Sequence, residues 1–384
     1  MSVRLASPRG GARGSGAGPS VGANAKELLA KAIREIVSAA VQGDRKQVHR
    51  DVLPGVDVVA RSSYNGRIAG VRVGFKDTLV DERSGRAVEK EVAWVATHME
   101  LVKPEMCNVH FYTLDDLPTV WWPPRYLGLL PDAFNAAVSA LGVGEELGKL
   151  GVRLEARGVT VKRMYWIRPI RKLFESSSIK LVPLVLLELD VNGKPLVLKD
   201  FHVTLRPKSG EVTILYDALL RHGDRKFARR LYMLSWLDAE LKSALERLKK
   251  EKGYDYKLVA PHAREVDCVY KVRFGDGETE VTCPRLSSSD IKYIDGEHLV
   301  YDGMLHISDA RKTNTAEELV RSITGDAESA IEKAKRKSSE IIAALINDAK
   351  RLLDSKDPRE KDLGFLLALL IKRAYEEAEM AIPG

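Results

Sequence analysis

The chain has 384 residues, of which 45% are hydrophobic and 30% are charged. This balance is typical of a globular protein and excludes one that is disordered throughout. The length allows two compact domains, or one large domain with an appendage. The formal net charge of +7 favours an anionic partner, and nucleic acid is the most common one.

Cysteine usage and the apolar runs exclude other classes of protein. The three cysteines include no CxxC pair, so they cannot form a disulfide framework, and we expect a cytoplasmic protein. The longest apolar run, residues 365–371, is far too short to span a bilayer, so we expect no membrane partner. Only two glutamines occur among many charged residues, a bias that indicates a thermophilic source.

The first part of the chain combines a basic arm with a helix and hairpins. Residues 1–25 are rich in glycine, serine and proline and carry arginines but no acid, which predicts a disordered basic arm. An amphipathic helix is expected over residues 26–41. Asn65-Gly66 favours a type I′ turn in a hairpin at residues 56–75, and a further turn is expected at Ser84-Gly85.

The centre of the chain is organised around a predicted hairpin at residues 178–206. Its turn is Asn192-Gly193, and Asn-Gly is the strongest short-range signal of a type I′ turn. A two-residue turn fixes the register of both strands, which places Val191 opposite Lys194.

Four residues of this hairpin have side chains suited to catalysis, namely Glu188, Asp190, Asp200 and His202. The register places Glu188 and Asp190 on one face of the hairpin, and Asp200 and His202 on the other. Pro183 falls opposite His202 at a hydrogen-bonded position, where it cannot donate to the ladder. We therefore expect the pairing to stop or bulge there, which could open a site.

The same hairpin resembles the core of PD-(D/E)xK nucleases, in which a Pro-Asp opens one strand and an acidic-x-Lys triplet lies on its partner. The corresponding residues are Pro183-Leu184 and Asp200-Phe201-His202, so leucine replaces the first aspartate and histidine replaces the lysine. The resemblance implies a divergent or degenerate metal-dependent nuclease. Mg²⁺ or Mn²⁺ is expected as a cofactor only in that case, and otherwise we expect no cofactor and no metal.

Two basic segments are candidates for nucleic-acid binding. The strand at residues 159–172 interleaves cations with aromatic residues, which suits the phosphates and bases of a single strand. A helix expected over residues 224–252 begins with a basic cluster, and a helix N-terminus with arginines suits phosphate. The candidate residues are Lys162, Arg163, Tyr165, Trp166, Arg168 and Arg171 on the strand, and Arg221, Arg225, Lys226, Arg229 and Arg230 at the helix.

Two other groups of residues could bind a partner or a metal, but we favour a role in the fold for both. Trp121 and Trp122 lie in a proline-rich bend, where they either stack on a partner or close a loop onto the core. His98, Cys107 and His110 are residue types that bind zinc, but we expect them to be ordinary strand residues. The chain contains no P-loop, Rossmann or nucleophile-elbow motif, so the chemistry of those motifs is unsupported.

The C-terminal sequence predicts two antiparallel helices. Thr315 and Glu318 form a capping box that opens a helix predicted to run to about Leu353, which Gly325 could interrupt. Asp357-Pro358 starts the second helix, with proline at the first helical position.

The sequence therefore predicts an α+β fold of antiparallel hairpins and meanders with packed helices. Its regions are a disordered basic arm (1–25), an N-terminal α+β region (26–150), a central α+β region (151–310) and a C-terminal helical hairpin (311–384). The function that we expect is the binding of DNA or RNA by a non-catalytic or accessory protein. The alternatives are the nuclease and an assembly protein that forms a homodimer through the helices at residues 315–380.

Overall fold

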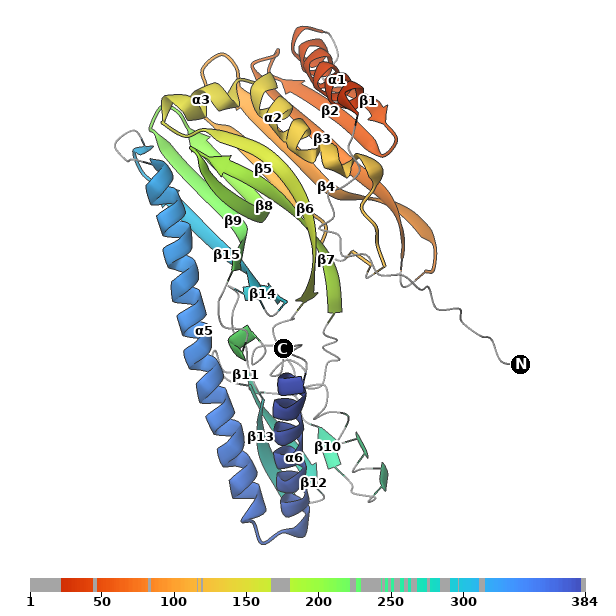
Figure 1. Ribbon diagram of the computed structural model, residues 1–384, viewed down its shortest axis with the longest axis vertical. Helices are drawn as coiled ribbons and strands as arrows, with labels where there is room; N and C mark the ends of the chain where they lie inside the picture. The colour runs from red at the N-terminus through yellow and green to blue at the C-terminus, as the bar shows by residue number, and fades with distance from the viewer. Residues whose placement is uncertain are drawn as a thin grey trace, which may run out of the picture.

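The computed structural model describes residues 22–43, 47–81, 84–115, 117–118, 120–166, 180–221, 226–228, 243, 246–247, 250–251, 256–258, 262–263, 268–274, 277–283, 291–295, 297–310 and 315–380. These residues form a mixture of helices and antiparallel strands, so the predicted α+β class is confirmed (Figure 1). The predicted basic arm lies outside the described residues as far as residue 21.

The centre of the molecule is an antiparallel sheet of 11 strands. Its strands are β1 (Gln47–Leu53), β2 (Val56–Ser63), β3 (Ile68–Val80), β4 (Ala87–Glu100), β5 (Cys107–Thr113), β6 (Leu154–Trp166), β7 (Lys180–Val191), β8 (Lys194–Arg206), β9 (Glu211–Arg221), β14 (Ile291–Ile294) and β15 (His298–Ile307). They are arranged in the order β1-β2-β3-β4-β5-β8-β7-β6-β14-β15-β9. Since β8 also pairs with β9, the strands from β8 through β7, β6, β14 and β15 to β9 form a closed ring.

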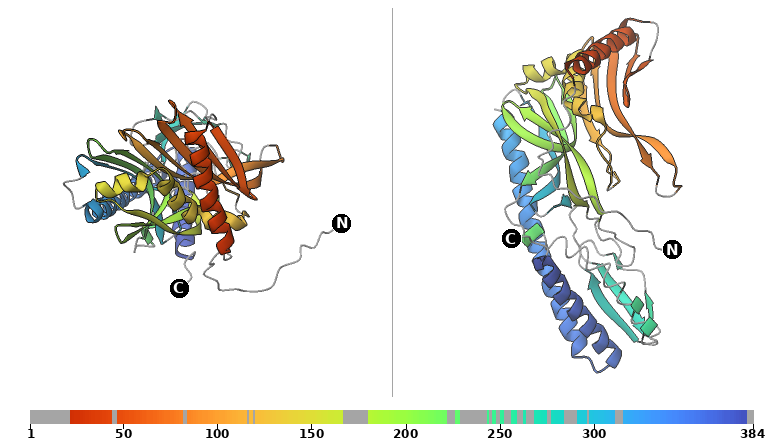
Figure 2. Two further views of the ribbon diagram at one scale, coloured as in Figure 1. Left: turned by 90° about the horizontal axis from the view of Figure 1, so that it is seen from above. Right: turned by 45° about the vertical axis from the view of Figure 1, so that its right-hand side comes forward.

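Helices cover one face of this sheet. They are α1 (Ala23–Gln42), the 3-10 helix η1 (Arg125–Leu129), α2 (Leu130–Ala140) and α3 (Val143–Lys149). α1 packs on β1, β2 and β3, and α2 packs on β3, β4 and β6 (Figures 1 and 2). Side chains alternate along the first half of β3, the second half of β4 and the whole of β5, so every second residue there is buried on the helix-covered face. We call the opposite face of β2, β3, β4 and β5 the open face.

The turn chemistry read from the sequence is confirmed in two hairpins. Asn192 and Gly193 have φ values of 49° and 86°, and Val191 pairs with Lys194 as predicted. Asn65-Gly66 joins β2 to β3 with φ values of 55° and 80°. Both turns have the positive φ angles that a type I′ turn requires.

The large sheet joins the two predicted α+β regions, because β5 pairs with β8 through contacts such as Phe111 opposite Phe201. A smaller antiparallel sheet contains β10 (Tyr256–Leu258), β11 (His262–Ala263), β12 (Cys268–Phe274) and β13 (Gly277–Cys283).

The C-terminal region forms the predicted helical hairpin. α5 (Thr315–Leu353) has the predicted bounds and runs through Gly325 without interruption. Leu319 and Ile323 in its first turns belong to the core of the large sheet. α6 (Pro358–Met380) lies beside the second half of α5 (Figures 1 and 2).

Within the described part of the chain, no single helix has the length and apolar character needed to cross a membrane. One bent pair, Arg125–Ala140 with Val143–Lys149, meets that test together, by length and composition only.

Candidate nucleic-acid interface

The structure describes only part of the basic cluster predicted at a helix N-terminus. Arg221 ends β9 and is exposed, and Lys226 is exposed as well. Arg225, Arg229 and Arg230 lie outside the described residues. The cluster therefore remains a prediction.

The second predicted basic segment is better described. β6 carries Lys162, Arg163 and Tyr165 and ends at Trp166, whereas Arg168 and Arg171 lie outside the described residues. Arg163 and Tyr165 are exposed and lie two positions apart, so they share a face of the strand.

The two tryptophans of the proline-rich bend have opposite environments. Trp121 is buried, and its indole Nε1 donates a hydrogen bond to Oδ2 of Asp77 on β3 at 2.7 Å. Trp122 is 76% exposed and is followed by Pro123 and Pro124. Trp121 thus closes the loop onto the core, as favoured from the sequence, while Trp122 is presented to solvent. Both the hydrogen bond and the prolines restrict the backbone that carries it.

Trp122 meets β6 although the two segments are far apart in the sequence. The guanidinium carbon of Arg163 lies 5.8 Å from the centroid of the Trp122 ring, a cation–π geometry. η1 packs against β6 and begins with Arg125, which is exposed and lies 5.5 Å from the ring of Tyr126. We call Trp122, Arg125, Arg163 and Tyr165 the Trp122 patch.

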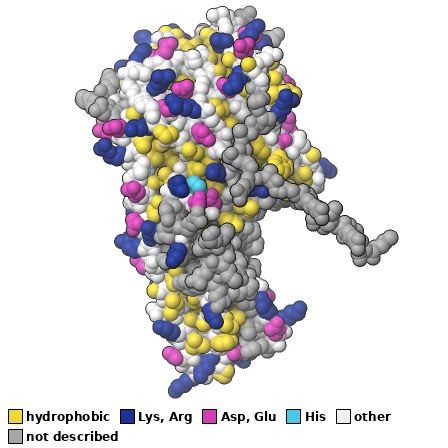
Figure 3. All heavy atoms as spheres, in the orientation of Figure 1, with side chains coloured by type: hydrophobic (Ala, Val, Ile, Leu, Met, Phe, Trp, Pro, Cys, Tyr) yellow, Lys and Arg dark blue, Asp and Glu magenta, His cyan; other side chains and the backbone are white. Residues whose placement is uncertain are grey.

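The charges of the Trp122 patch are uncompensated within the part of the chain that the structure describes. No carboxylate there lies within ion-pair distance of Arg125 or Arg163. Elsewhere the surface is mixed, and Figure 3 shows basic and acidic side chains interspersed on the face seen in Figure 1. The net charge is therefore not spread as one basic surface on that face.

The four predicted catalytic residues do not form one group. Glu188 is exposed on β7 and lies beside Gly158 of β6. Asp190 is buried, with Oδ2 2.8 Å from Arg157 and Oδ1 accepting a hydrogen bond from the backbone of Gly193 at 2.6 Å. Asp190 therefore supports the turn of the hairpin.

Asp200 and His202 lie beyond a bulge in β8. The ladder between β7 and β8 ends at Leu187 and Leu198, and the register against β9 shifts between Leu198 and Asp200. The pairing therefore stops at Leu187, before it reaches Pro183, where the sequence predicted the stop. The shift moves Phe201 onto the buried helix-covered face and turns His202 to the opposite face, so the face that the regular register predicted for His202 is wrong.

Lys199 lies at this bulge and forms a buried charged cluster. The side chain of Lys199 is 1% exposed. Its amino group contacts Asp115, lies 2.7 Å from Oδ2 of Asp200 and 3.9 Å from Oδ2 of Asp217. Burial alone lowers the pKa of Lys199, but the carboxylates and Tyr293 raise it well above its usual range. The ammonium therefore lies between carboxylates that come from three segments of the chain and balances their charge.

Histidines gather on the open face and on the adjoining β8. The rings of His110 and His202 stack with centroids 3.8 Å apart. The pKa of His110 is lowered to about 4, mainly by burial and also by the nearby His202 and His98. Burial also lowers the pKa of His202. Both rings are therefore neutral near pH 7.

The three residues that resemble zinc ligands do not converge. Cys107 is buried on the helix-covered face of β5, whereas His110 lies on the open face of the same strand. Burial raises the pKa of the Cys107 thiol to about 11, so the thiolate that metals bind is disfavoured. No group of three metal-binding side chains occurs within the described ranges.

Sequence reasoning did not single out Lys199, Asp115, Asp217 or Tyr293. A lone lysine next to an aspartate in an otherwise apolar strand is a weak signal, and its partners come from three distant segments. Comparisons with protein-family models, with curated proteins and with solved structures found no match to this chain.

Proposed function

We propose that the protein binds single-stranded DNA or RNA through the Trp122 patch. The observation that carries the proposal is the guanidinium of Arg163 beside the exposed ring of Trp122. An aromatic face stacks on a base whatever its identity, and arginines contact the neighbouring phosphates. The net charge of +7 supports an anionic partner.

The rigidity of the loop supports binding as well. Trp121 and its hydrogen bond to Asp77 hold the loop before any ligand arrives. The backbone that carries Trp122 therefore loses little entropy on binding, and more of the stacking energy contributes to affinity. A single strand is favoured over a duplex because its bases are free to leave one another and stack on protein.

The test is fluorescence anisotropy with labelled single-stranded DNA and RNA at several salt concentrations. Trp122→Ala should weaken binding by about 1–3 kcal/mol, the contribution of one stacked base. Arg163→Ala should lower the slope of log K against log salt by about 0.7, because one phosphate contact is lost.

The matched controls are Tyr64→Ala and Arg67→Ala, which remove an exposed aromatic ring and an exposed arginine in the β2–β3 turn. Both should leave the affinity and the salt slope unchanged. Equal affinities of wild type and the Trp122→Ala/Arg163→Ala double variant would sink the proposal, as would tighter binding of duplex than of single strands.

A second candidate is assembly of a homodimer through α6. Phe365 and Leu369 are 59% and 46% exposed, and their spacing places them on the same face of the helix. Phe365→Glu should turn a dimer into a monomer in sedimentation equilibrium, with Arg359→Gln at an exposed position of the same helix as a control. A monomeric wild type at micromolar concentration rejects this candidate.

A further inference from the structure

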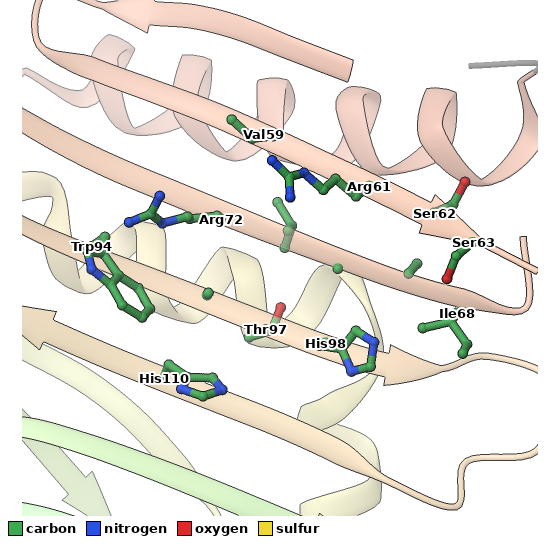
Figure 4. Close-up of a pocket in the computed structure, with 14 residues that line it drawn as sticks. Val59, Arg61, Ser62, Ser63, Ile68, Arg72, Trp94, Thr97, His98 and His110 are labelled. Atoms are coloured by element: carbon green, nitrogen blue, oxygen red, sulfur yellow. The ribbon is translucent and has the colours of Figure 1, made fainter. Parts of the chain in front are cut away.

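A groove of about 590 Å³ is hollowed into the open face of the sheet. Its lining comes from β2, β3, β4 and β5, and Figure 4 shows the side chains on the side of the strands turned away from the helices. The volume lies within the range of about 300–1,000 Å³ that is usual for small-molecule pockets. It does not overlap the Trp122 patch, none of whose residues line it.

The hollow exists because small residues occupy its floor. Gly70 on β3 and Ala96 on β4 stand where long side chains would fill the space. A Cβ atom at Gly70 would lie 3.3 Å from the carbonyl oxygen of Thr97 and 3.6 Å from the ring of His98. A side chain at position 70 would therefore crowd β4, and glycine keeps the floor of the groove free of side-chain atoms.

Arginines and rings form the walls. Arg61 and Arg72 project from adjacent strands on one side of the floor, and Trp94, His98 and His110 follow on the strands beyond it (Figure 4). The guanidinium of Arg72 lies 4.8 Å from the Trp94 ring and forms an ion pair with Glu91. Trp94 in turn stacks on Tyr112 with centroids 5.6 Å apart. The ring wall is thus held in place by its own contacts.

The groove is lined by two arginines, and only one of them is paired with a carboxylate among the described residues. Among the residues that the structure describes, no aspartate or glutamate lines the groove. Arg72 is balanced by Glu91, but no carboxylate within the described ranges lies at ion-pair distance from Arg61. A cation would meet no anionic ligand here, and an apolar molecule would leave the Arg61 charge without a partner. An anionic group satisfies the guanidinium.

We propose that this groove binds a small molecule in which a planar ring carries an anionic group, the class to which nucleoside monophosphates belong. The ring lies over Gly70 and Ala96 beside Trp94, and the anionic group contacts Arg61. The proposal is independent of the proposed nucleic-acid binding, because it depends on a different face of the sheet and on different residues.

The experiment is isothermal titration calorimetry of the full chain with AMP, GMP, CMP and UMP. Adenosine and ribose 5-phosphate serve as fragments that lack the phosphate and the ring. At least one monophosphate should bind at least about tenfold more tightly than either fragment, because both walls contribute. Absence of binding by all four monophosphates at millimolar concentration would overturn the proposal.

Variants locate the binding. Arg61→Ala should weaken the binding of the monophosphate by at least about tenfold, since a charge-assisted contact is lost. Ala96→Leu, with Ala96→Val as a milder change, should abolish or reduce it by filling the floor. Arg67→Ala is the matched control, an exposed arginine of the same hairpin that does not line the groove.

Two further measurements distinguish monophosphate binding in the groove from single-strand binding at the Trp122 patch. Trp122→Ala/Arg163→Ala should leave monophosphate binding intact, and Arg61→Ala should retain binding of the single strand. Unfolding curves of each variant exclude a folding defect. Monophosphate binding that survives both Arg61→Ala and Ala96→Leu would show that the groove is not the site.

Discussion

Lys199 and Asp200 are consecutive residues, yet the amino group of the first contacts the carboxylate of the second at 2.7 Å inside the protein. Consecutive side chains of a regular strand point to opposite faces. The register shift between Leu198 and Asp200 removes that constraint, and Asp200 also accepts hydrogen bonds from the backbone and hydroxyl of Thr113. One bulge thus joins β8 to the end of β5.

Removal of the Lys199 charge is expected to destabilise the fold strongly. Lys199→Met leaves Asp200 and the buried Asp217 without their shared cation, and breaking a buried ion pair from one side costs about 3–5 kcal/mol. Urea unfolding measures this change. Lys194→Met on the same strand is the control, because Lys194 is exposed and lies 4.0 Å from Glu317, and it should change the free energy of unfolding by less than about 0.5 kcal/mol. A loss below about 1 kcal/mol for Lys199→Met would contradict the cluster's role.

His110 is expected to make stability depend on pH. Its pKa is about 4 in the folded protein, mainly because of burial, and about 6.5 in an unfolded chain. Between these values the unfolded state binds a proton that the native state does not, so the free energy of unfolding falls as the pH decreases through this window. His110→Phe keeps a ring and removes the titration. The loss of stability from pH 7 to pH 4.5 should shrink by about 1–2 kcal/mol, after allowance for the partial exposure of the ring.

Urea unfolding at a series of pH values between those limits checks this expectation. His306→Phe is the control, because His306 is exposed on β15 and is hydrogen-bonded to Thr213 at 2.8 Å. A pH profile of His110→Phe that matches the wild type would contradict the assignment.

Local chemistry made much of the fold predictable. The Asn-Gly turns, the register of the central hairpin and the C-terminal helical hairpin all follow from residues near one another in the sequence. The closure of β8 on β9 and the pairing of β5 with β8 do not, because these contacts join distant segments. No local pattern marks Lys199 as a bulged residue, so the faces of the residues that follow it were assigned wrongly.

The candidate site was predictable in pieces. Arg163 and Tyr165 were found from the alternation of cations with rings. For Trp122 the sequence offered stacking on a partner but favoured closure of the loop onto the core, and its exposure was not predicted. Their meeting depends on the packing of η1 against β6, which a single sequence does not encode locally. The groove was missed because its residues alternate with core residues on four strands, and only the sheet order brings Arg61, Arg72 and Trp94 together.

Two glycines of the C-terminal hairpin should respond in opposite directions to alanine. A Cβ atom at Gly364 would lie 2.7 Å from the backbone nitrogen of Leu353 and 2.8 Å from Cβ of Leu352, so α5 and α6 would have to separate. Gly364→Ala should cost about 1–3 kcal/mol through overpacking. Gly325 has open space around its Cβ position in mid-helix, and Gly325→Ala should stabilise by about 0.5–1 kcal/mol. Thermal unfolding of both variants checks the signs, and destabilisation by Gly325→Ala would show that α5 is not continuous there.

The two Asn-Gly turns provide a matched pair for the last prediction. Asn192 and Asn65 have nearly equal φ values of 49° and 55°, so replacement by alanine strains both turns alike. Only Asn192 also uses its side chain. Its Nδ2 donates to the carbonyl oxygen of Gly151 at 2.6 Å, and its Oδ1 accepts from the backbone of Arg153 at 2.5 Å.

These two bonds tie the central hairpin to the segment that leads into β6. Asn192→Ala should therefore lower the free energy of unfolding by about 1–3 kcal/mol more than Asn65→Ala, the contribution of two hydrogen bonds at a partly exposed site. Asn192→Asp separates the two contacts, because it keeps the acceptor for Arg153 and loses the donor to Gly151. Urea unfolding should place it between the wild type and Asn192→Ala. Equal losses for Asn192→Ala and Asn65→Ala would mean that only the backbone of the turn, and not its side chain, holds the hairpin against β6.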